Sequence, residues 1–284
     1  MKKVKIYISD SSDIYTNLAL EEYFVTESDE DILLFYVNTD AVVIGKHQNP
    51  WKEVDLTSIT NTGKPHKVAR RLSGGGTVFH DIGNINFSFI RNKDVDFVNF
   101  REHIEPISIA LSSLGIPNEI SLRNDIFVQN HKVSGNAEHV NSRKKRILHH
   151  GTLLYDSDLI RLNGSIRAKE KLTIETHAVD SVRSPVMNMR DVQDLGNTPD
   201  FLSTLTSRLQ YDLGIEEISN INPENINAVN ELVANKYTRW EWIFGHTPSF
   251  KYTDDKGNIY KIKKGTVEEA ELKQHLGKKF SEIL

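Results

Sequence analysis

The chain of 284 residues contains no cysteine. This absence excludes a disulfide framework, a cysteine-ligated zinc site and a thiol nucleophile, and it favours a cytoplasmic protein. Glycine and proline are also sparse, at 16 and 8 residues. That scarcity excludes collagenous and low-complexity material, so we expect a folded chain with one dominant core.

An excess of basic residues is likewise missing. The 35 lysines and arginines face 39 acidic residues, which gives a formal net charge of −4. General nucleic-acid binders rely on phosphate neutralisation, so this balance argues against nucleic acid as a partner. The longest apolar run near the start covers only residues 32–37. We therefore expect neither a signal peptide nor a membrane partner.

Strand-like and helix-like segments alternate from the start of the chain. Runs at 4–9, 31–37 and 41–45 are rich in Ile, Val, Tyr and Phe, and residues 16–25 have apolar positions at helical spacing. In residues 84–90, apolar and polar side chains alternate. One face of that strand should pack in the core while the other remains polar.

The clearest helix pattern covers residues 97–115, where apolar residues recur at steps of three and four. Gly115 is a typical helix terminator. Pro106 lies inside the pattern and predicts two aligned helical pieces. Near the C-terminus, residues 239–244 are expected to form a Trp-rich strand and residues 250–264 a hairpin, followed by a short helix that carries Leu272, Leu276 and Phe280.

Two arginines, Arg70 and Arg71, lead into three consecutive glycines, Gly74 to Gly76. Glycine-rich backbone can present consecutive N–H groups to a phosphate or carboxylate, and a nearby arginine adds charge-assisted bonds. Neither a Walker loop nor a dinucleotide-binding fingerprint occurs. From these residues alone, a tight turn with exposed arginines is an equally good interpretation.

A second candidate segment, residues 124–137, has the pattern of a β-hairpin with its turn near Asn130. It contains Lys132, which is followed by the small residues Ser134, Gly135 and Ala137. Small residues permit close approach by a ligand, and the lysine supplies a mobile positive charge. On spacing alone, a solvent-facing lysine on an edge strand is the favoured interpretation. The run 143–146 is basic and is either a solvated loop or a docking site for an acidic partner.

Two histidine-containing pairs, His80-Asp81 and His149-His150, invite interpretation as metal ligands. Adjacent residues on a strand point to opposite faces, so neither pair is expected to hold one metal ion.

Four segments occur in a fixed order, and together they resemble lipoate-protein ligases of the A type. They read RRLSGGGTVFHDIGNINFSF, NDIFVQNHKVSGNA, HHGTLLYD and SVRSPVMNM, and the resemblance extends from residue 6 to residue 250. It implies an α+β fold with a mixed, largely antiparallel sheet flanked by helices, like the catalytic domains of biotin protein ligase and class II aminoacyl-tRNA synthetases. It also implies a catalytic domain over residues 1–245 and an abbreviated C-terminal accessory domain over 246–284.

The resemblance implies a two-step reaction that needs ATP and Mg²⁺. Lipoate is activated to lipoyl-AMP, and the lipoyl group is then transferred to a lysine of a carrier domain. The implied carriers are the E2 subunits of 2-oxoacid dehydrogenases and glycine cleavage H-type proteins. Activation requires the lipoate carboxylate and ATP, both anions, to be held together while the developing negative charge is neutralised. Arg71, Lys132 and the glycine loop suit this task.

Site residues follow from the same resemblance. Lys132 is the catalytic residue, bridging the carboxylate and the α-phosphate, and Asp125 positions Lys132 or Mg²⁺. The implied ATP-binding residues are Arg71, Gly76, Thr77, Val78, Phe79 and Lys132. The implied lipoate-binding residues are Arg71, Ser73, Gly75, His80, Lys132, Gly135, Ala137 and His149. The loop that orders over the adenylate is matched by Ser181, Val182, Arg183 and Ser184.

Three other functions were weighed against this one. An acyl amidotransferase of the same fold requires a cysteine, which this chain lacks. A noncatalytic binding module is disfavoured because Arg71, the glycines and Lys132 occur together. A lipoyltransferase that uses preformed lipoyl-AMP, with weak or absent activation, remains open.

Overall fold

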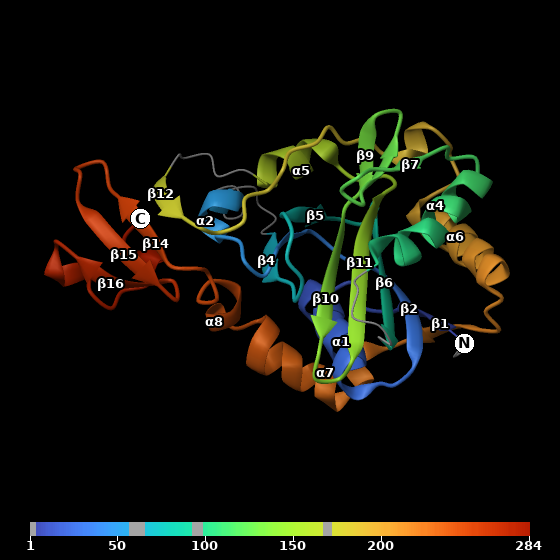
Figure 1. Ribbon diagram of the computed structural model, residues 1–284, viewed down its shortest axis with the longest axis horizontal. Helices are drawn as coiled ribbons and strands as arrows, with labels where there is room; N and C mark the ends of the chain where they lie inside the picture. The colour runs from blue at the N-terminus through green and yellow to red at the C-terminus, as the bar shows by residue number, and fades with distance from the viewer. Residues whose placement is uncertain (1–3, 57–65, 93–98, 167–171) are drawn as a thin grey trace. The chain divides into compact units, whose positions relative to one another are not determined.

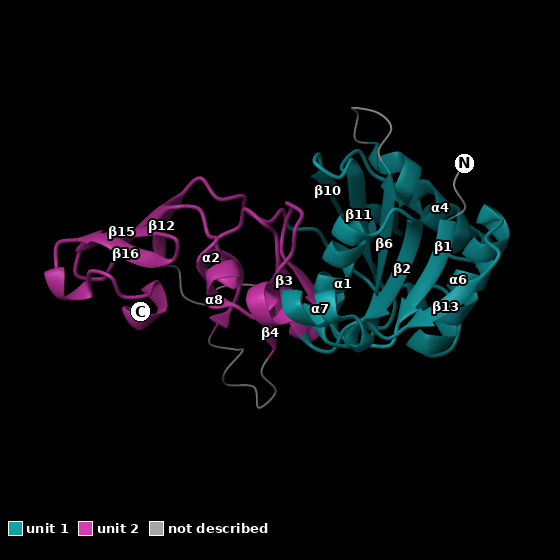
Figure 2. Cartoon of the chain, turned by 90° about the horizontal axis from the view of Figure 1, so that it is seen from below, with its two compact units in different colours: residues 1–40, 80–159, 183–232 teal, residues 41–79, 160–182, 233–284 magenta. Residues whose placement is uncertain are grey.

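A computed structural model of the chain describes residues 4–56, 66–92, 99–166 and 172–284. The chain divides into two compact units, shown in Figure 2. Unit 1 comprises residues 1–40, 80–159 and 183–232, and unit 2 comprises residues 41–79, 160–182 and 233–284. Each unit is therefore assembled from segments that are distant in sequence.

Unit 1 is built on a six-stranded mixed sheet (Figure 1). Its strands in spatial order are β10 (Asn136–Asn141), β11 (Arg146–Leu154), β6 (Asn84–Asn92), β2 (Asp31–Val37), β1 (Val4–Ser9) and β13 (Ile218–Ile221). The pairs from β10 to β2 are antiparallel, and the pairs of β1 with β2 and β13 are parallel. The predicted mixed, largely antiparallel sheet is thus confirmed.

Apolar and polar side chains alternate along β6, and different helices pack against the two faces of the sheet that they define. The apolar side chains of Ile85, Phe87 and Phe89 share a core with α4 (Phe100–Ser113) and α6 (Thr198–Leu213). On the polar side, Ser88 contacts Glu21 of α1 (Ile14–Glu27). Unit 1 also contains the short helix α7 (Asn227–Leu232). The predicted division into one core face and one polar face is correct.

The helix α4 is one continuous element with Pro106 inside it, so the prediction of two pieces is wrong. Proline removes one backbone hydrogen bond, but the buried side chains of Ile104, Ile107 and Leu111 hold both halves on the same core. Gly115 follows the helix at φ +84°, as predicted for a terminator. Phe97, the first residue of the expected pattern, lies outside the described residues.

A small antiparallel sheet in unit 1 carries the candidate lysine. It consists of β7 (Glu119–Ile120), β8 (Ile126–Val128) and β9 (His131–Ser134). Gln129 and Asn130 connect β8 to β9 with φ of +47° and +63°. Two consecutive positive φ values are typical of the tightest hairpin turns, and the predicted hairpin is confirmed.

The described residues of unit 2 form two sheets. The first is three-stranded in the order β4 (Lys67–Arg70), β3 (Ala41–Ile44), β5 (Val78–His80), with α2 (Pro50–Glu53) following β3 in the chain. The second is four-stranded in the order β12 (Thr173–Thr176), β14 (Phe250–Thr253), β15 (Ile259–Lys263), β16 (Thr266–Ala270). The short helices are α5 (Leu159–Ser165), which begins at the unit boundary, and α8 (Trp240–Ile243).

The C-terminal residues share a core with an earlier part of unit 2. Trp51 of α2 packs its ring against Phe250 and Phe280, at centroid distances of 5.7 and 5.1 Å. The strand β12 pairs with β14. The predicted hairpin is present as β14 and β15, with Gly257 at φ +85° in its turn. A functional boundary between residues 245 and 246 stays a prediction.

Two C-terminal predictions are wrong. Residues 240–243 form α8 instead of a strand, because the indole N–H of Trp242 donates to the carbonyl of Arg70 and tertiary contact overrides β propensity. The expected final helix is replaced by 3₁₀ turns at Lys273–His275 and Phe280–Glu282. Gly277 separates them at φ +77°, outside helical geometry.

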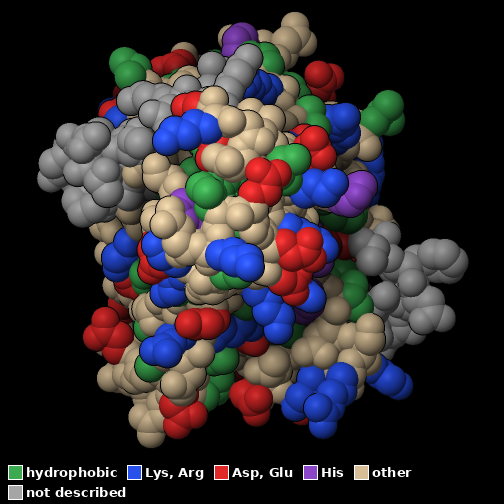
Figure 3. All heavy atoms as spheres, turned by 90° about the vertical axis from the view of Figure 1, so that its left-hand side faces the viewer, with side chains coloured by type: hydrophobic (Ala, Val, Ile, Leu, Met, Phe, Trp, Pro, Cys, Tyr) green, Lys and Arg blue, Asp and Glu red, His purple; other side chains and the backbone are tan. Residues whose placement is uncertain are grey.

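Charges of both signs are mixed on one face of the molecule (Figure 3). Acidic and basic side chains are interspersed on the face shown in Figure 3, in keeping with the near balance of the two signs in the sequence. Among the described residues, no helix is both long enough and apolar enough to cross a membrane.

Candidate functional site

The glycine loop of unit 2 folds back closely on the turn after β3. Gly75 has φ +83°, which favours glycine. A Cβ atom on Gly45 would lie 2.2 Å from the carbonyl oxygen of Gly75, so a side chain at position 45 would clash with backbone. Gly45 was not identified as a functional residue from the sequence. The glycine loop nevertheless requires a glycine there, because the backbone of Gly75 lies against it.

Arg71 holds the glycine loop from within. Its guanidinium donates to the carbonyl of Val43 at 3.2 Å, to the hydroxyl of Ser73 at 3.0 Å and to the carbonyl of Gly76 at 2.7 Å. It also donates to the carbonyl of Gly74. Arg71 is buried, so a turn with exposed arginines is the wrong interpretation. A direct contact of Arg71 or Ser73 with nucleotide or lipoate stays a prediction.

Arg70 braces the neighbouring turn. It is fully buried, and one guanidinium nitrogen donates to the carbonyls of Gly45, Lys46 and Gln48 at 2.9–3.0 Å. Other nitrogens donate to the carbonyl of Ile243 and to the hydroxyl of Thr247. Burial, with a smaller contribution from Arg71, lowers the pKa of Arg70 to about 9, which leaves it cationic at neutral pH.

Ser181 closes a hydrogen-bond network at the end of the glycine loop. Its hydroxyl accepts from the backbone N–H of Thr77 at 2.9 Å and from the amide of Gln48 at 3.0 Å, and it donates to Glu53 at 2.5 Å. The Gln48 oxygen accepts from the N–H of Gly45 and from the Thr77 hydroxyl, both at 2.9 Å. Ser181 and Thr77, predicted separately, are therefore brought together.

Sequence reasoning missed Gln48 and Glu53. Both are buried. Both lie in residues 44–54, which are part of the resemblance but were given no role in the reaction. Their contact with Ser181 could not be predicted from the sequence, because Ser181 is more than 100 positions away in the chain.

The two residues after Thr77 point in different directions. Phe79 is buried, with its ring edge-on to His66 at 5.5 Å and the guanidinium of Arg161 at 5.9 Å from its centroid. Val78 is only partly buried. The predicted ATP contacts of Gly76, Val78 and Phe79 are not tested by these positions.

In unit 1, Lys132 forms an ion pair with Asp125 at 2.9 Å, and its side chain is 25% exposed. A Cβ atom on Gly135 would lie 3.1 Å from Cε and 3.2 Å from Nζ of this lysine. The glycine thus leaves the space that the lysine side chain occupies. The expected neighbourhood of Asp125, Lys132 and Gly135 is present.

The surroundings of Gly135 connect the lysine to the polar face of the large sheet. The N–H of Gly135 donates to the hydroxyl of Thr152 at 3.2 Å. His150 is two residues earlier on β11 and therefore points to the same face. Ala137 pairs with His150 in register and shares that face.

A buried carboxylate lies on this polar face. Glu21 of α1 is 3.1 Å from Nδ1 of His150 and accepts from the hydroxyls of Tyr36 at 2.8 Å and Ser88 at 2.5 Å. Burial raises the pKa of Glu21, but the charge of His150 and these three hydrogen bonds outweigh it, so the pKa lies below its usual value. His80 also lies among polar groups, with Nδ1 2.9 Å from the amide nitrogen of Asn38.

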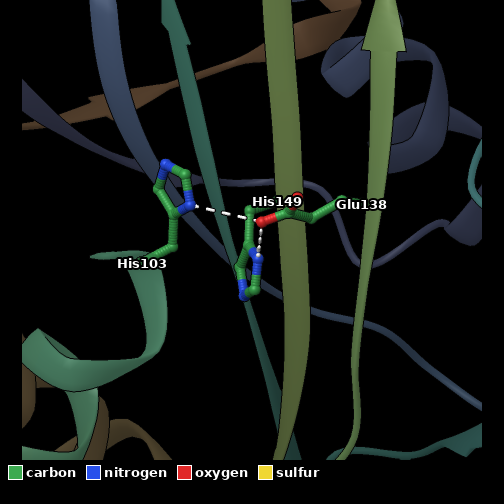
Figure 4. Close-up of side chains that lie close together, drawn as sticks. All are labelled: His103, Glu138 and His149. Carbon is green, nitrogen blue, oxygen red and sulfur yellow. Dashed lines mark hydrogen bonds and ion pairs between the residues drawn. The ribbon is translucent and has the colours of Figure 1, made fainter. Parts of the chain in front are cut away.

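His149 points away from this group. On β11 it faces α4 instead of α1, and its Nδ1 lies 2.7 Å from Glu138 (Figure 4). Burial lowers the pKa of His149 to about 4. The structure brings Gly135 beside Lys132 and places Ala137 on the face of β11 opposite to that of His149.

The segment after Ser181 is anchored in both units. Ser181 belongs to the unit 2 network, whereas the carbonyl of Pro185 accepts from the N–H of Lys132 at 2.8 Å within unit 1. Val186 then forms a parallel bridge with Lys132. Val182 and Arg183 between these anchors are exposed.

Comparison with known proteins adds independent findings. Residues 13–209 match the model of the lipoyl protein ligase A/B catalytic domain. The chain is 37% identical over 269 residues to lipoate-protein ligase LplJ of Bacillus subtilis, covering 90% of this chain and 80% of that protein.

Two solved structures are similar at 25% identity and a TM-score of 0.72. One is a bi-partite lipoate protein ligase from Thermoplasma acidophilum, studied with its E2 lipoyl domain, and the match covers 87% of this chain and 98% of that one. The other is a lipoate-protein ligase A bound with ATP, and the match covers 87% of this chain and all of that one.

Proposed function

Because the chain belongs to the lipoyl protein ligase A/B family, we propose that it activates lipoate with ATP and transfers the lipoyl group to a lysine of a carrier domain. The observation that carries the proposal is the setting of Lys132. Its side chain is partly exposed, its ammonium group forms an ion pair with Asp125, and it has room because residue 135 is glycine. A similar solved structure holds ATP, the co-substrate of such a reaction.

In the proposed first step, a carboxylate oxygen of lipoate attacks the α-phosphorus of ATP. A new P–O bond forms, the bond between the α-phosphorus and the oxygen that bridges it to the β-phosphate breaks, and pyrophosphate leaves. Negative charge accumulates around the α-phosphate, where a preorganised cation lowers the barrier. Lys132 supplies that cation, and the step needs no nucleophile from the enzyme.

The glycine loop of unit 2 supplies neutral donors suited to ATP phosphates. Arg71 binds the carbonyls of Gly74 and Gly76 and so fixes the loop conformation before any ligand arrives. Backbone N–H groups in such a fixed loop form a concavity for phosphate oxygens. The N–H of Thr77 donates to the hydroxyl of Ser181 in this structure, so its use by a phosphate requires that bond to break.

In the second step, the amine of a carrier lysine attacks the acyl carbon of lipoyl-AMP, an amide forms and AMP leaves. The mixed anhydride must be protected from water until the carrier arrives. Residues 181–184 are suited to covering it, because Ser181 and Pro185 are anchored and Val182 and Arg183 between them are exposed.

Mg²⁺ fits this site as an ion that arrives with ATP. Magnesium is usually held by substrate phosphates and only one or two carboxylates. Asp125 is one such carboxylate, and its pairing with Lys132 suits it first to positioning the lysine.

We propose E2 subunits of 2-oxoacid dehydrogenases and glycine cleavage H-type proteins as carriers, in the cytoplasm. An E2 lipoyl domain accompanies the similar archaeal ligase. The direct test is ATP–pyrophosphate exchange that depends on lipoate, followed by transfer to an isolated lipoyl domain.

Exchange and transfer together are the expected result. Transfer from synthetic lipoyl-AMP without exchange would instead identify a lipoyltransferase that lacks activation. Absence of both activities in folded protein would contradict the proposal.

A further inference from the structure

Three titratable side chains converge on the α4 side of the unit 1 sheet, away from Lys132 (Figure 4). They are His103 on α4, Glu138 on β10 and His149 on β11. Each can direct one ligand atom to a common point, and these atoms all lie within 4.8 Å of one another. The side chains are 4%, 3% and 0% exposed, so the cluster is part of the interior.

The strand register places two of the three side chains together. Glu138 and His149 are direct partners across the β10–β11 pair, so both project from the same face. His103 approaches that face from the first turns of α4, with its ring 5.0 Å from that of His149. Nδ1 of His149 lies 2.7 Å from a Glu138 carboxylate oxygen, and Nδ1 of His103 lies 3.4 Å from the same oxygen.

Hydrogen bonding around His149 leaves one group without a match. The amide nitrogen of Asn136 donates to the carbonyl of Asn124 at 2.8 Å, which turns the amide oxygen toward Nε2 of His149 at 3.3 Å. Two acceptors, one from Asn136 and one from Glu138, therefore face opposite nitrogens of one imidazole. A neutral imidazole carries a single N–H and cannot donate to both.

Two further atoms of the cluster lack hydrogen bonds in the described part of the chain. These are Nδ1 of His103 and the second carboxylate oxygen of Glu138, both buried and both within the cluster. Polar atoms without hydrogen bonds at this depth are costly, and the convergence of ligand atoms from all three residues calls for a cation there.

We propose that His103, Glu138 and His149 bind a divalent transition-metal ion, with Zn²⁺ as the best chemical fit. Imidazole nitrogen and carboxylate oxygen are common zinc ligands. A metal on Nδ1 of His149 leaves its Nε2–H free to donate to Asn136, which resolves the mismatch. The same ion takes Nδ1 of His103 and gives the second Glu138 oxygen a partner, so Glu138 can supply two of four ligand atoms.

The site is structural by its position. Its ligands come from one helix and two strands, so the ion ties the start of α4 to β10 and β11. Burial leaves no open coordination position for a substrate, unlike a catalytic metal. This inference is independent of the proposed ligase reaction, since the cluster lies on the opposite face of β11 from His150 and Thr152.

The first experiment measures metal in the whole protein, produced without a polyhistidine tag in medium supplied with Zn²⁺ or Co²⁺. After exhaustive dialysis against a chelator and then buffer, we expect about one equivalent of metal per chain. The cobalt form should show the visible absorption of a four-coordinate ion, and X-ray absorption of the zinc form should show nitrogen and oxygen ligands at about 2.0–2.2 Å.

Variants locate the ion. Glu138→Gln keeps the shape of the side chain but removes its charge, and His103→Leu removes one nitrogen; each should lower the metal affinity at least about 100-fold. The matched control is His177→Ala, which removes an exposed histidine of unit 2 and should retain the full equivalent.

The proposal is overturned if the wild-type protein retains no metal, because the cluster is then held by a proton alone. It is also overturned if both variants keep the ion, or if the control loses it. Should the variants fail to fold, the ligand identities from X-ray absorption of the wild-type protein decide the question by themselves.

Discussion

The glycine loop of unit 2 and the lysine hairpin of unit 1 use positive charge in opposite ways. Arg71 donates to three acceptors of its own loop and to the carbonyl of Val43 on β3, and Arg70 donates to three carbonyls of the adjoining turn. Lys132 is partly exposed, and its ion pair in the described structure is with the single carboxylate of Asp125. The arginines therefore build a surface, whereas the lysine is available to a ligand.

This difference shows that a cation near a candidate site need not act on the substrate. A guanidinium with five donors in a rigid fork can fix several carbonyls at once, which suits it to shaping a loop. An ammonium on a flexible stem can follow charge as it moves during a reaction. The following substitutions test this division.

The largest expected effect on stability is that of Arg70→Met. It leaves several buried carbonyls without donors, and each such group costs about 1–3 kcal/mol. We expect the free energy of unfolding in urea to fall by about 3–5 kcal/mol. Arg208→Met, which removes a surface arginine paired with Asp212, is the control and should cost under about 1 kcal/mol. An equal loss of unfolding free energy in the two variants would show that the hydrogen bonds of Arg70 do not stabilise the turn more than a surface ion pair does.

Gly75→Val should have the next largest effect. A β-branched residue at φ +83° is strained by about 1–3 kcal/mol, and its side chain would distort the loop. We expect lower unfolding free energy and loss of ATP and lipoyl-AMP binding in calorimetric titration.

The control for stability is Gly74→Val, because a Cβ atom on Gly74 meets nothing within 4 Å. Unchanged ligand affinity of folded Gly75→Val would remove the loop from the binding site.

Ser181→Ala should have a moderate effect. It removes the acceptor of the Thr77 N–H and one donor to Glu53. We expect the loss of these bonds to cost about 1 kcal/mol and to leave residues 181–184 less ordered. We expect hydrolysis of lipoyl-AMP to rise about fivefold relative to transfer, while pyrophosphate exchange changes less. Ser207→Ala, at an exposed position of α6, provides the comparison, and an identical partition in wild type and Ser181→Ala would contradict the covering role.

The smallest effect concerns the basic loop after β10. Arg143, Lys144 and Lys145 are exposed, but Arg146 is buried and donates to the carbonyl of Glu30, so the predicted run of four solvated cations is wrong at its last member. Reversing the three exposed charges to Glu should slow transfer to a lipoyl domain about two- to fivefold at low salt and spare exchange.

The control for this loop reverses three exposed lysines, Lys251, Lys256 and Lys264, at the same total charge. A salt-independent loss, or an equal loss in exchange, would argue against docking.

Sequence predicted the elements whose signals are local. The alternation along β6, the hairpin before Lys132 and the terminator Gly115 each depend on neighbouring residues, and each is present. The continuous helix through Pro106 and the helical turn at Trp240 depend on packing against distant segments, and both were predicted wrongly.

The same distinction holds for the candidate site. Asp125, Lys132 and Gly135 are close in the chain and were predicted as neighbours. Gln48 and Glu53 contact Ser181 from about 130 positions away, at sequence separations of 133 and 128. Alternation along β11 places His150 on the face of Ala137 and His149 on the opposite face, and a lipoate contact of His149 stays a prediction.

The most direct test of the account is lipoate-dependent ATP–pyrophosphate exchange by Lys132→Met at saturating substrates, measured beside its unfolding in urea. If Lys132 acts on the reacting groups, exchange should fall by about 100- to 1000-fold with the unfolding free energy changed by less than about 1 kcal/mol. Near-normal exchange by the folded variant would contradict the account, because the lysine would then have no part in activating lipoate.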